Sequence, residues 1–130
     1  ADAWKEEINV FFGRILNNLG LAYHTAGDFN LALMHYKKSL IYKKRAGDLI
    51  GIAQTSINIC KTNYKCHNYR KFYYWRNKAI ALIEKYQLDY QRAYLLREIG
   101  AINCEQGKVK SGLKMLRAAL ILYNSISYLI

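Results

Sequence analysis

Apolar residues recur along most of the chain at intervals of three and four, the spacing that places them on one face of an α-helix. Short polar stretches interrupt this pattern, and the chain has no proline. Asp28, Asp48, Asn68 and Asp89 each precede an apolar-periodic stretch and are therefore predicted to cap a helix. We predict six helices, over about residues 2–25, 29–46, 49–65, 69–86, 90–106 and 108–124.

The helical pattern returns at a fixed interval of 40 residues. The clearest corresponding positions are Leu19-Gly20, Ile59-Cys60 and Ile99-Gly100, then Gly27, His67 and Gly107, then Ser39, Ala79 and Ala119. A constant period of this length is typical of proteins built from stacked repeats. Small residues at the same place in each repeat predict that its two helices approach closely.

The first repeat carries Leu19-Gly20, Tyr23, Gly27, Ala32, Tyr36 and a small residue at Ser39. These residues at this spacing resemble the tetratricopeptide repeat. The other two repeats depart from the family pattern at Cys60, Asn63, His67, Phe72 and Asn103. The family repeat is about 34 residues long, so the longer repeat here is similar to the long-helix variants in the sensory parts of bacterial signalling proteins.

This resemblance implies an all-α fold, a right-handed superhelix of three antiparallel helix pairs, that is, a TPR-like solenoid. We predict one repeat domain over residues 1–130, with repeats at about 9–47, 48–87 and 88–124. Residues 125–130 are expected to form a tail or the start of a fourth repeat. Because the chain begins without methionine and ends on an apolar stretch, we expect it to be a piece of a longer protein.

Composition narrows the function classes. The chain has 20 Lys and Arg against 9 Asp and Glu, a net charge of +11, which attracts acidic peptides, nucleic acid or anionic surfaces. No apolar run is long enough to span a membrane. Its three cysteines include no C-x-x-C pair, so no disulfide framework is implied. We expect a cytoplasmic protein, or a periplasmic one if the parent protein carries a leader.

Patterns that support catalysis or metal binding are absent from the sequence. There is no glycine-rich phosphate loop, no G-x-S-x-G and no H-E-x-x-H. Cys60 and Cys66 are six residues apart on one predicted helix and so face different ways, which argues against a zinc site with His67. Cys60 occupies a small-residue position and is expected to be a buried, inert thiol. We predict no enzyme activity, no cofactor and no metal.

The resemblance also implies where a ligand would bind, because the family's contacts come mainly from the inner face of each repeat's first helix. Carried over by position, the predicted peptide-binding groove consists of Arg14, Asn17, Asn18, Leu21, Gln54, Asn58, Lys61, Tyr64, Tyr94 and Arg97. The same face includes His24, Ile57, Glu98, Ala101 and Cys104. The carboxylate clamp of chaperone-binding relatives is disfavoured, since its positions hold Tyr94 and Glu98 here.

Asn18 and Asn58 occupy the same position in successive repeats. In peptide-binding relatives, asparagines at this position hydrogen-bond the backbone of an extended peptide, and an amide can both donate to and accept from any peptide bond. Alternatively, Asn18 is a polar neighbour of the core and Asn58 matches it by coincidence. Both interpretations stay open at this point.

A basic and aromatic stretch in the second repeat suggests a different partner. Residues 49–83 contain no Asp or Glu. They contain Lys61, Lys65, Arg70, Lys71, Arg76 and Lys78, interleaved with Tyr64, Tyr69, Phe72, Tyr73, Tyr74 and Trp75. Aromatic rings among cations are used by platforms for single-stranded nucleic acid. The competing and favoured interpretation is that Tyr69, Phe72, Tyr73 and Arg76 are mostly core between repeats, with the lysines facing solvent.

We therefore predict a repeat scaffold that binds a protein or peptide segment, with Lys61 and Arg97 favouring acidic side chains. The resemblance places such a scaffold in the interaction region of a bacterial signalling or regulatory protein. The first alternative is a structural module whose copies associate through Phe11, Phe12 and the apolar stretch 121–130. The second is nucleic-acid binding through the basic and aromatic stretch.

Overall fold

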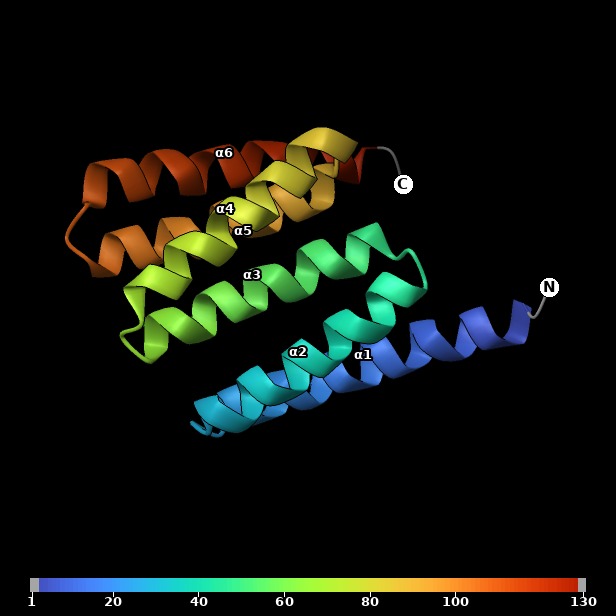
Figure 1. Cartoon of the computed structure of the whole chain (residues 1–130). Helices are drawn as coiled ribbons and strands as arrows, with labels where there is room; N and C mark the ends of the chain where they lie inside the picture. The colour runs from blue at the N-terminus through green and yellow to red at the C-terminus, as the bar shows by residue number, and fades with distance from the viewer. Residues whose placement is uncertain (1–2, 129–130) are drawn as a thin grey trace. The chain divides into compact units, whose positions relative to one another are not determined.

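The computed structural model describes residues 3–128, and these residues form six α-helices and no strands. The helices are α1 (Ala3–Thr25), α2 (Phe29–Arg45), α3 (Leu49–Lys65), α4 (Tyr69–Tyr86), α5 (Asp89–Glu105) and α6 (Val109–Ser127). α1 packs beside α2, α2 beside α3, and α5 beside α6 (Figure 1). The predicted all-α class is confirmed. No helix in the described part of the chain is both long enough and apolar enough to cross a membrane.

The chain divides into two compact units, which we call the N-terminal unit, residues 1–82, and the C-terminal unit, residues 83–130. The boundary lies inside α4. The N-terminal unit contains α1, α2, α3 and most of α4, and the C-terminal unit contains α5 and α6.

The 40-residue period is visible in the backbone of the turns. The residue at which each turn reverses the chain has a positive φ, and these residues are Gly27, Gly47, His67, Gln87 and Gly107. In each turn, the residue that follows donates its N–H to a carbonyl five residues back, as Asp28 does to Tyr23 at 2.9 Å. This is the hydrogen bond of a helix C-terminal motif, in which a left-handed residue lets the chain satisfy the last carbonyls.

Two aspartates begin helices as predicted. Asp28 Oδ1 accepts a hydrogen bond from the Leu31 N–H at 3.2 Å, and Asp48 Oδ1 accepts one from the Gly51 N–H at 2.9 Å. Each carboxylate thereby satisfies one of the backbone donors that a helix leaves unpaired at its start.

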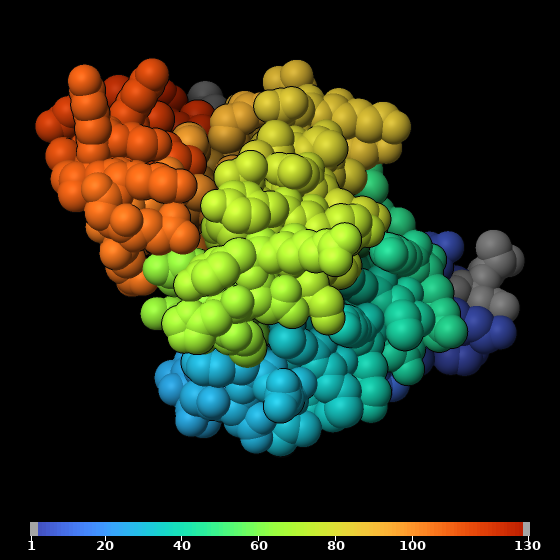
Figure 2. Space-filling model, turned by 60° about the vertical axis from the view of Figure 1, so that its left-hand side comes forward, coloured from blue at the N-terminus to red at the C-terminus, as the bar shows by residue number. Residues whose placement is uncertain are grey.

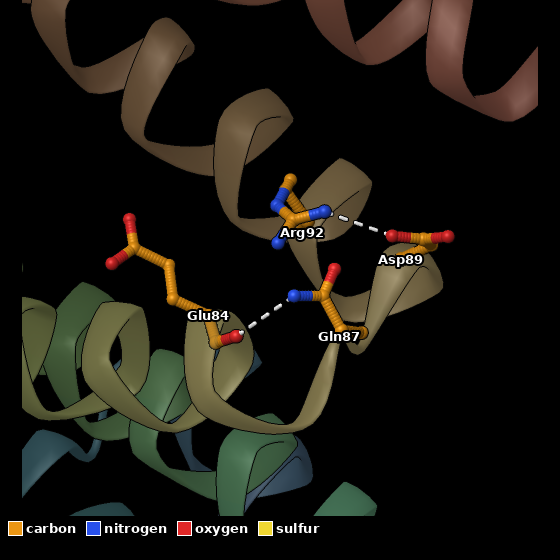
Figure 3. A network of polar contacts seen from close by, with 4 residues as sticks. All are labelled: Glu84, Gln87, Asp89 and Arg92. Atoms are coloured by element: carbon orange, nitrogen blue, oxygen red, sulfur yellow. Dashed lines mark hydrogen bonds and ion pairs between the residues drawn. The ribbon is translucent and has the colours of Figure 1, made fainter.

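The predicted cap at Asp89 is wrong. The residue at the N-cap of α5 is Leu88, which makes no side-chain hydrogen bond to the helix, and Asp89 is already helical. Asp89 instead accepts a hydrogen bond from Arg92 at 2.8 Å, one turn further along, while Gln87 donates to the Glu84 carbonyl at 3.4 Å (Figure 3). α5 therefore begins one residue earlier than the predicted cap at Asp89 implied. Leu88 occupies the N-cap position that Asp28 and Asp48 occupy in their turns.

The core of the N-terminal unit lies between α2 and α3. Ala32, Tyr36 and Leu40 from α2 and Ile59 from α3 are almost fully buried there, and Trp75 from α4 packs against them. Gly20 of α1 lies against the Tyr36 ring, where a side chain would collide with the ring carbons. Further along α3, Tyr64 packs against Tyr69 and Phe72 of α4.

The C-terminal unit repeats the same kind of close helix contact. Gly100 of α5 lies against α6, because a Cβ there would be 3.1 Å from the Gly112 carbonyl oxygen. Leu95 and Ile99 of α5 and Ala119 of α6 are buried. The expectation that small residues let the helices of a repeat approach closely is therefore met at both Gly20 and Gly100.

Candidate functional site

A pocket of about 270 Å³ lies in the N-terminal unit, where α1 and α3 meet the end of α2. It is lined by Arg14, Asn17, Asn18, Lys43, Asp48, Ile50, Gly51 and Gln54. The structure thus brings together Arg14, Asn17, Asn18 and Gln54, which were predicted as groove residues from two different repeats. Lys43 was not among the predicted residues.

Lys43 is almost completely buried, with 3% of its surface exposed. Its Nζ donates hydrogen bonds to the Gly51 carbonyl at 3.2 Å and to Thr55 Oγ1 at 2.7 Å. Burial lowers the pKa of Lys43 from its ordinary 10.5 to about 8, and Arg14 lowers it further while Asp48 opposes the change. The pocket therefore contains a buried amine whose charge depends on pH near neutrality.

Two glycines leave the space that the Lys43 side chain occupies. A Cβ on Gly13 of α1 would be 2.7 Å from Lys43 Cγ, and a Cβ on Gly51 of α3 would be 2.9 Å from Lys43 Cδ. Real Cβ atoms do not approach other atoms so closely. The lysine stem is therefore enclosed by the backbones of two helices, and this enclosure keeps the amine out of water.

A chain of hydrogen bonds leads from Lys43 into the contact between α1 and α3. Thr55 Oγ1 accepts from Lys43 and donates to Asn17 Oδ1 at 2.9 Å. Asn58 Nδ2 donates to the same Asn17 oxygen at 3.1 Å. The Asn17 carbonyl oxygen is thus already paired twice inside the unit, which fixes its side chain.

The two asparagines at equivalent repeat positions differ in exposure. Asn18 is exposed at the pocket, whereas Asn58 is 1% exposed and bonded to Asn17. The expected ladder of two amides facing a ligand is therefore not what the structure presents, because Asn58 serves the contact between α1 and α3. The second interpretation made Asn18 the polar neighbour of the core, but it is Asn58 that is buried, while Asn18 is exposed.

The other predicted groove residues lie outside this pocket. Leu21 packs against the core formed by α2 and α3. Lys61 and Tyr64 are half-buried further along α3, and Tyr64 contacts α4. Tyr94 and Arg97 belong to the C-terminal unit, where the Arg97 guanidinium lies 5.0 Å from the centre of the Tyr94 ring and donates to Glu98 at 3.1 Å.

Cys60 and His24 make contacts inside the N-terminal unit. Burial raises the pKa of Cys60 to about 12, which makes its thiol a poor nucleophile, and its Sγ donates to the Phe72 carbonyl at 3.4 Å. His24 Nδ1 lies 2.8 Å from Thr62 Oγ1. Within residues 3–128, no three His, Cys, Asp or Glu side chains lie close enough together to hold a metal ion.

The aromatic residues of α4 are more exposed than the sequence suggested. Phe72 is buried, but Tyr69, Tyr73 and Tyr74 are 39–53% exposed, and the side chains of α4, yellow-green in Figure 2, stand at the surface of the N-terminal unit. The expectation that Tyr69 and Tyr73 are mostly core is therefore wrong. The Arg76 guanidinium lies 4.9 Å from the centre of the Tyr73 ring, so a neighbouring cation already covers one of the rings that would stack a base.

Comparison of the sequence with known protein families and with curated proteins finds no match. The assignment of a function therefore depends on the pocket and on the repeat pattern.

Proposed function

We propose that this chain is a TPR-like repeat scaffold that binds an extended peptide or protein segment, and that the pocket of the N-terminal unit receives an acidic group of that segment. The observation that carries the proposal is the pocket itself, where Arg14, Lys43, the exposed Asn18 amide and the half-buried Gln54 amide line one cavity. The right-handed superhelix of three helix pairs is part of the same proposal and is supported by the 40-residue period.

The chemistry of the lining suits a carboxylate on a peptide. Arg14 is exposed and offers a planar guanidinium that pairs a carboxylate through two hydrogen bonds. Asn18 and Gln54 offer amides that both donate to and accept from a peptide backbone. Asp48 also lines the pocket, but its Oδ1 accepts from the Gly51 N–H, so the carboxylate is engaged in starting α3.

By resemblance, such a scaffold belongs to the interaction region of a bacterial signalling or regulatory protein in the cytoplasm. The resemblance supports this setting only as an analogy, because one fold serves many functions. The pocket supports the narrower part of the proposal, the binding of an acidic segment.

A peptide library with one fixed Asp or Glu tests this proposal directly. We expect the chain to enrich particular acidic sequences, and we expect Arg14→Ala to weaken the best of them by about tenfold or more, the effect of losing a charge-assisted hydrogen bond. Asn18→Ala should weaken the same peptides less, because it removes neutral hydrogen bonds. Affinities are measured by fluorescence anisotropy, and helical circular dichroism confirms that each variant is folded.

Lys38→Ala is the matched control, since Lys38 is an exposed cation on α2 outside the pocket. It lowers the net charge by the same amount as Arg14→Ala. Equal losses from the two substitutions would mean that acidic peptides are held by the overall positive charge alone. An absence of any enriched sequence would also contradict the proposal.

A further inference from the structure

Two helices expose rows of large apolar side chains. On α1, Phe12, Ile15 and Leu19 are 40–56% exposed. On α6, Leu113 and Leu120 are 40% and 63% exposed. The repeat pattern shows what each of these rows is suited to contact.

By the 40-residue period, the exposed residues on α1 correspond to residues of α3 that are buried. Adding 40 to Ile15 and Leu19 gives Thr55 and Ile59, and both are 0% exposed. Ile59 belongs to the core that α3 shares with α2. The surface of α1 that contains Leu19 is therefore the surface on which α3 receives α2.

The row on α6 corresponds in the same way to residues of α2. Subtracting 80 from Leu120 and Leu113 gives Leu40, which is 5% exposed, and Leu33, which packs against the core shared with α3. The surface of α6 that contains Leu120 is therefore the surface that α2 presents to α3.

We propose that two copies of this chain associate head to tail, with α6 of one copy packed on α1 of the next in the register that α2 and α3 use. The two surfaces are the two halves of one interface that the chain already makes internally. This inference goes beyond the proposed peptide binding and does not depend on it.

The side chain at the position of Lys43 supports this register. Lys43 donates to the carbonyl of Gly51 and to the hydroxyl of Thr55, so a polar side chain of α2 meets polar atoms of α3. In the proposed contact, the residue 80 positions after Lys43 is Tyr123, and the residues 40 positions before Gly51 and Thr55 are Phe11 and Ile15. The cation and the Thr55 hydroxyl that it meets are thus replaced together by an aromatic ring and an aliphatic side chain, while the larger Phe11 at the Gly51 position requires a wider spacing of the two helices.

Such an interface joins two different surfaces. An assembly of any size therefore keeps one exposed surface of each kind and can add further copies. The net charge of +11 opposes association, and salt screens this repulsion. We therefore expect association to strengthen as salt is raised. Binding of nucleic acid or of acidic peptides has the opposite dependence on salt.

The first test is the mass of the chain by sedimentation velocity, over a wide range of concentration and at low and high salt. We expect the average mass to rise with both. Leu120→Glu and Ile15→Glu should each weaken association by at least about tenfold, because each buries an unpaired charge in the contact.

Ile121→Glu is the matched control for Leu120→Glu. Ile121 is 67% exposed, and the corresponding residue of α2, Ile41, is itself 50% exposed and so lies outside the contact with α3. We expect Ile121→Glu to associate like the unmodified chain. Equal losses from both glutamates, or a monomer at every concentration and salt, would overturn the proposal.

The polarity of the contact is tested by cross-linking in a background with Cys66→Ser and Cys104→Ser. A short bismaleimide should link a chain with Ile15→Cys to a chain with Tyr123→Cys when the two are mixed, whereas neither variant should link to itself. Cys60 is buried, so it is left in place. Links between two Tyr123→Cys chains would show a symmetric contact through α6 and overturn the head-to-tail arrangement.

Discussion

Replacing Gly20 by alanine is expected to lower the free energy of unfolding of the N-terminal unit by about 2–3 kcal/mol. A Cβ at this position would be 2.5 Å from Cδ1 of Tyr36 and would overlap the adjoining ring carbon. The ring is 0% exposed and packed with Ala32, Leu40 and Ile59, so it has little room to move. Overpacking of this kind outweighs the gain of about 1 kcal/mol that alanine brings to a helix interior.

The measurement is urea denaturation followed by the fluorescence of Trp75, which packs against the same core. The double variant Gly20→Ala with Tyr36→Leu is the informative control, because the corresponding pair in the C-terminal unit is Gly100 and Leu116. We expect Gly20→Ala to cost much less in the Tyr36→Leu background than alone. An equal cost in both backgrounds would show that the contact with the ring does not explain the glycine.

Replacing Lys43 by methionine is expected to remove a pH dependence of stability that the unmodified chain shows between about pH 8 and pH 10.5. The folded chain holds the Lys43 pKa at about 8, against 10.5 for an ordinary lysine. Between these values the unfolded chain binds more protons at this residue, so stability rises as the pH rises. The rise amounts to about 3 kcal/mol over this interval, which methionine should abolish.

The measurement is the free energy of unfolding of the unmodified chain and of Lys43→Met at several values of pH from 7 to 10.5. All other titratable groups are the same in both proteins, so their contribution cancels in the difference. Lys44→Met is the matched control, since Lys44 is the exposed neighbour on the same helix. If Lys43→Met and Lys44→Met follow the same pH profile, the amine of Lys43 is not held as the structure describes.

Most of the helix boundaries could be predicted from the sequence because the residues that make them act locally. Asp28 and Asp48 cap helices through their own backbone neighbours, and Gly27 and Gly47 adopt the left-handed conformation that ends a helix. The prediction failed at Asp89, where the capping position is one residue earlier and holds Leu88. The capping rule thus located α5 correctly but assigned Asp89 to the N-cap, whereas Asp89 is the first residue of the helix.

The pocket was harder to predict because its chemistry arises between helices. The sequence placed Lys43 in the last turn of a helix, beside Lys44 and Arg45, with nothing local to set it apart. The repeat contains the missing signal, because the corresponding positions hold Ile83 and Tyr123, which indicates a side chain that points inward. The burial of Asn58 likewise depends on Asn17, 41 residues away.

The measurement that tests the central claim most directly is the mapping of an acidic peptide onto the chain by NMR, with backbone amides assigned and an alanine-substituted version of the peptide as control. The account predicts that the acidic peptide shifts the signals of Arg14, Asn18, Gly51 and Gln54, and that the alanine version does not. Shifts confined to the basic and aromatic residues of α4, or no shift within the pocket, would contradict the claim that this pocket binds an acidic segment.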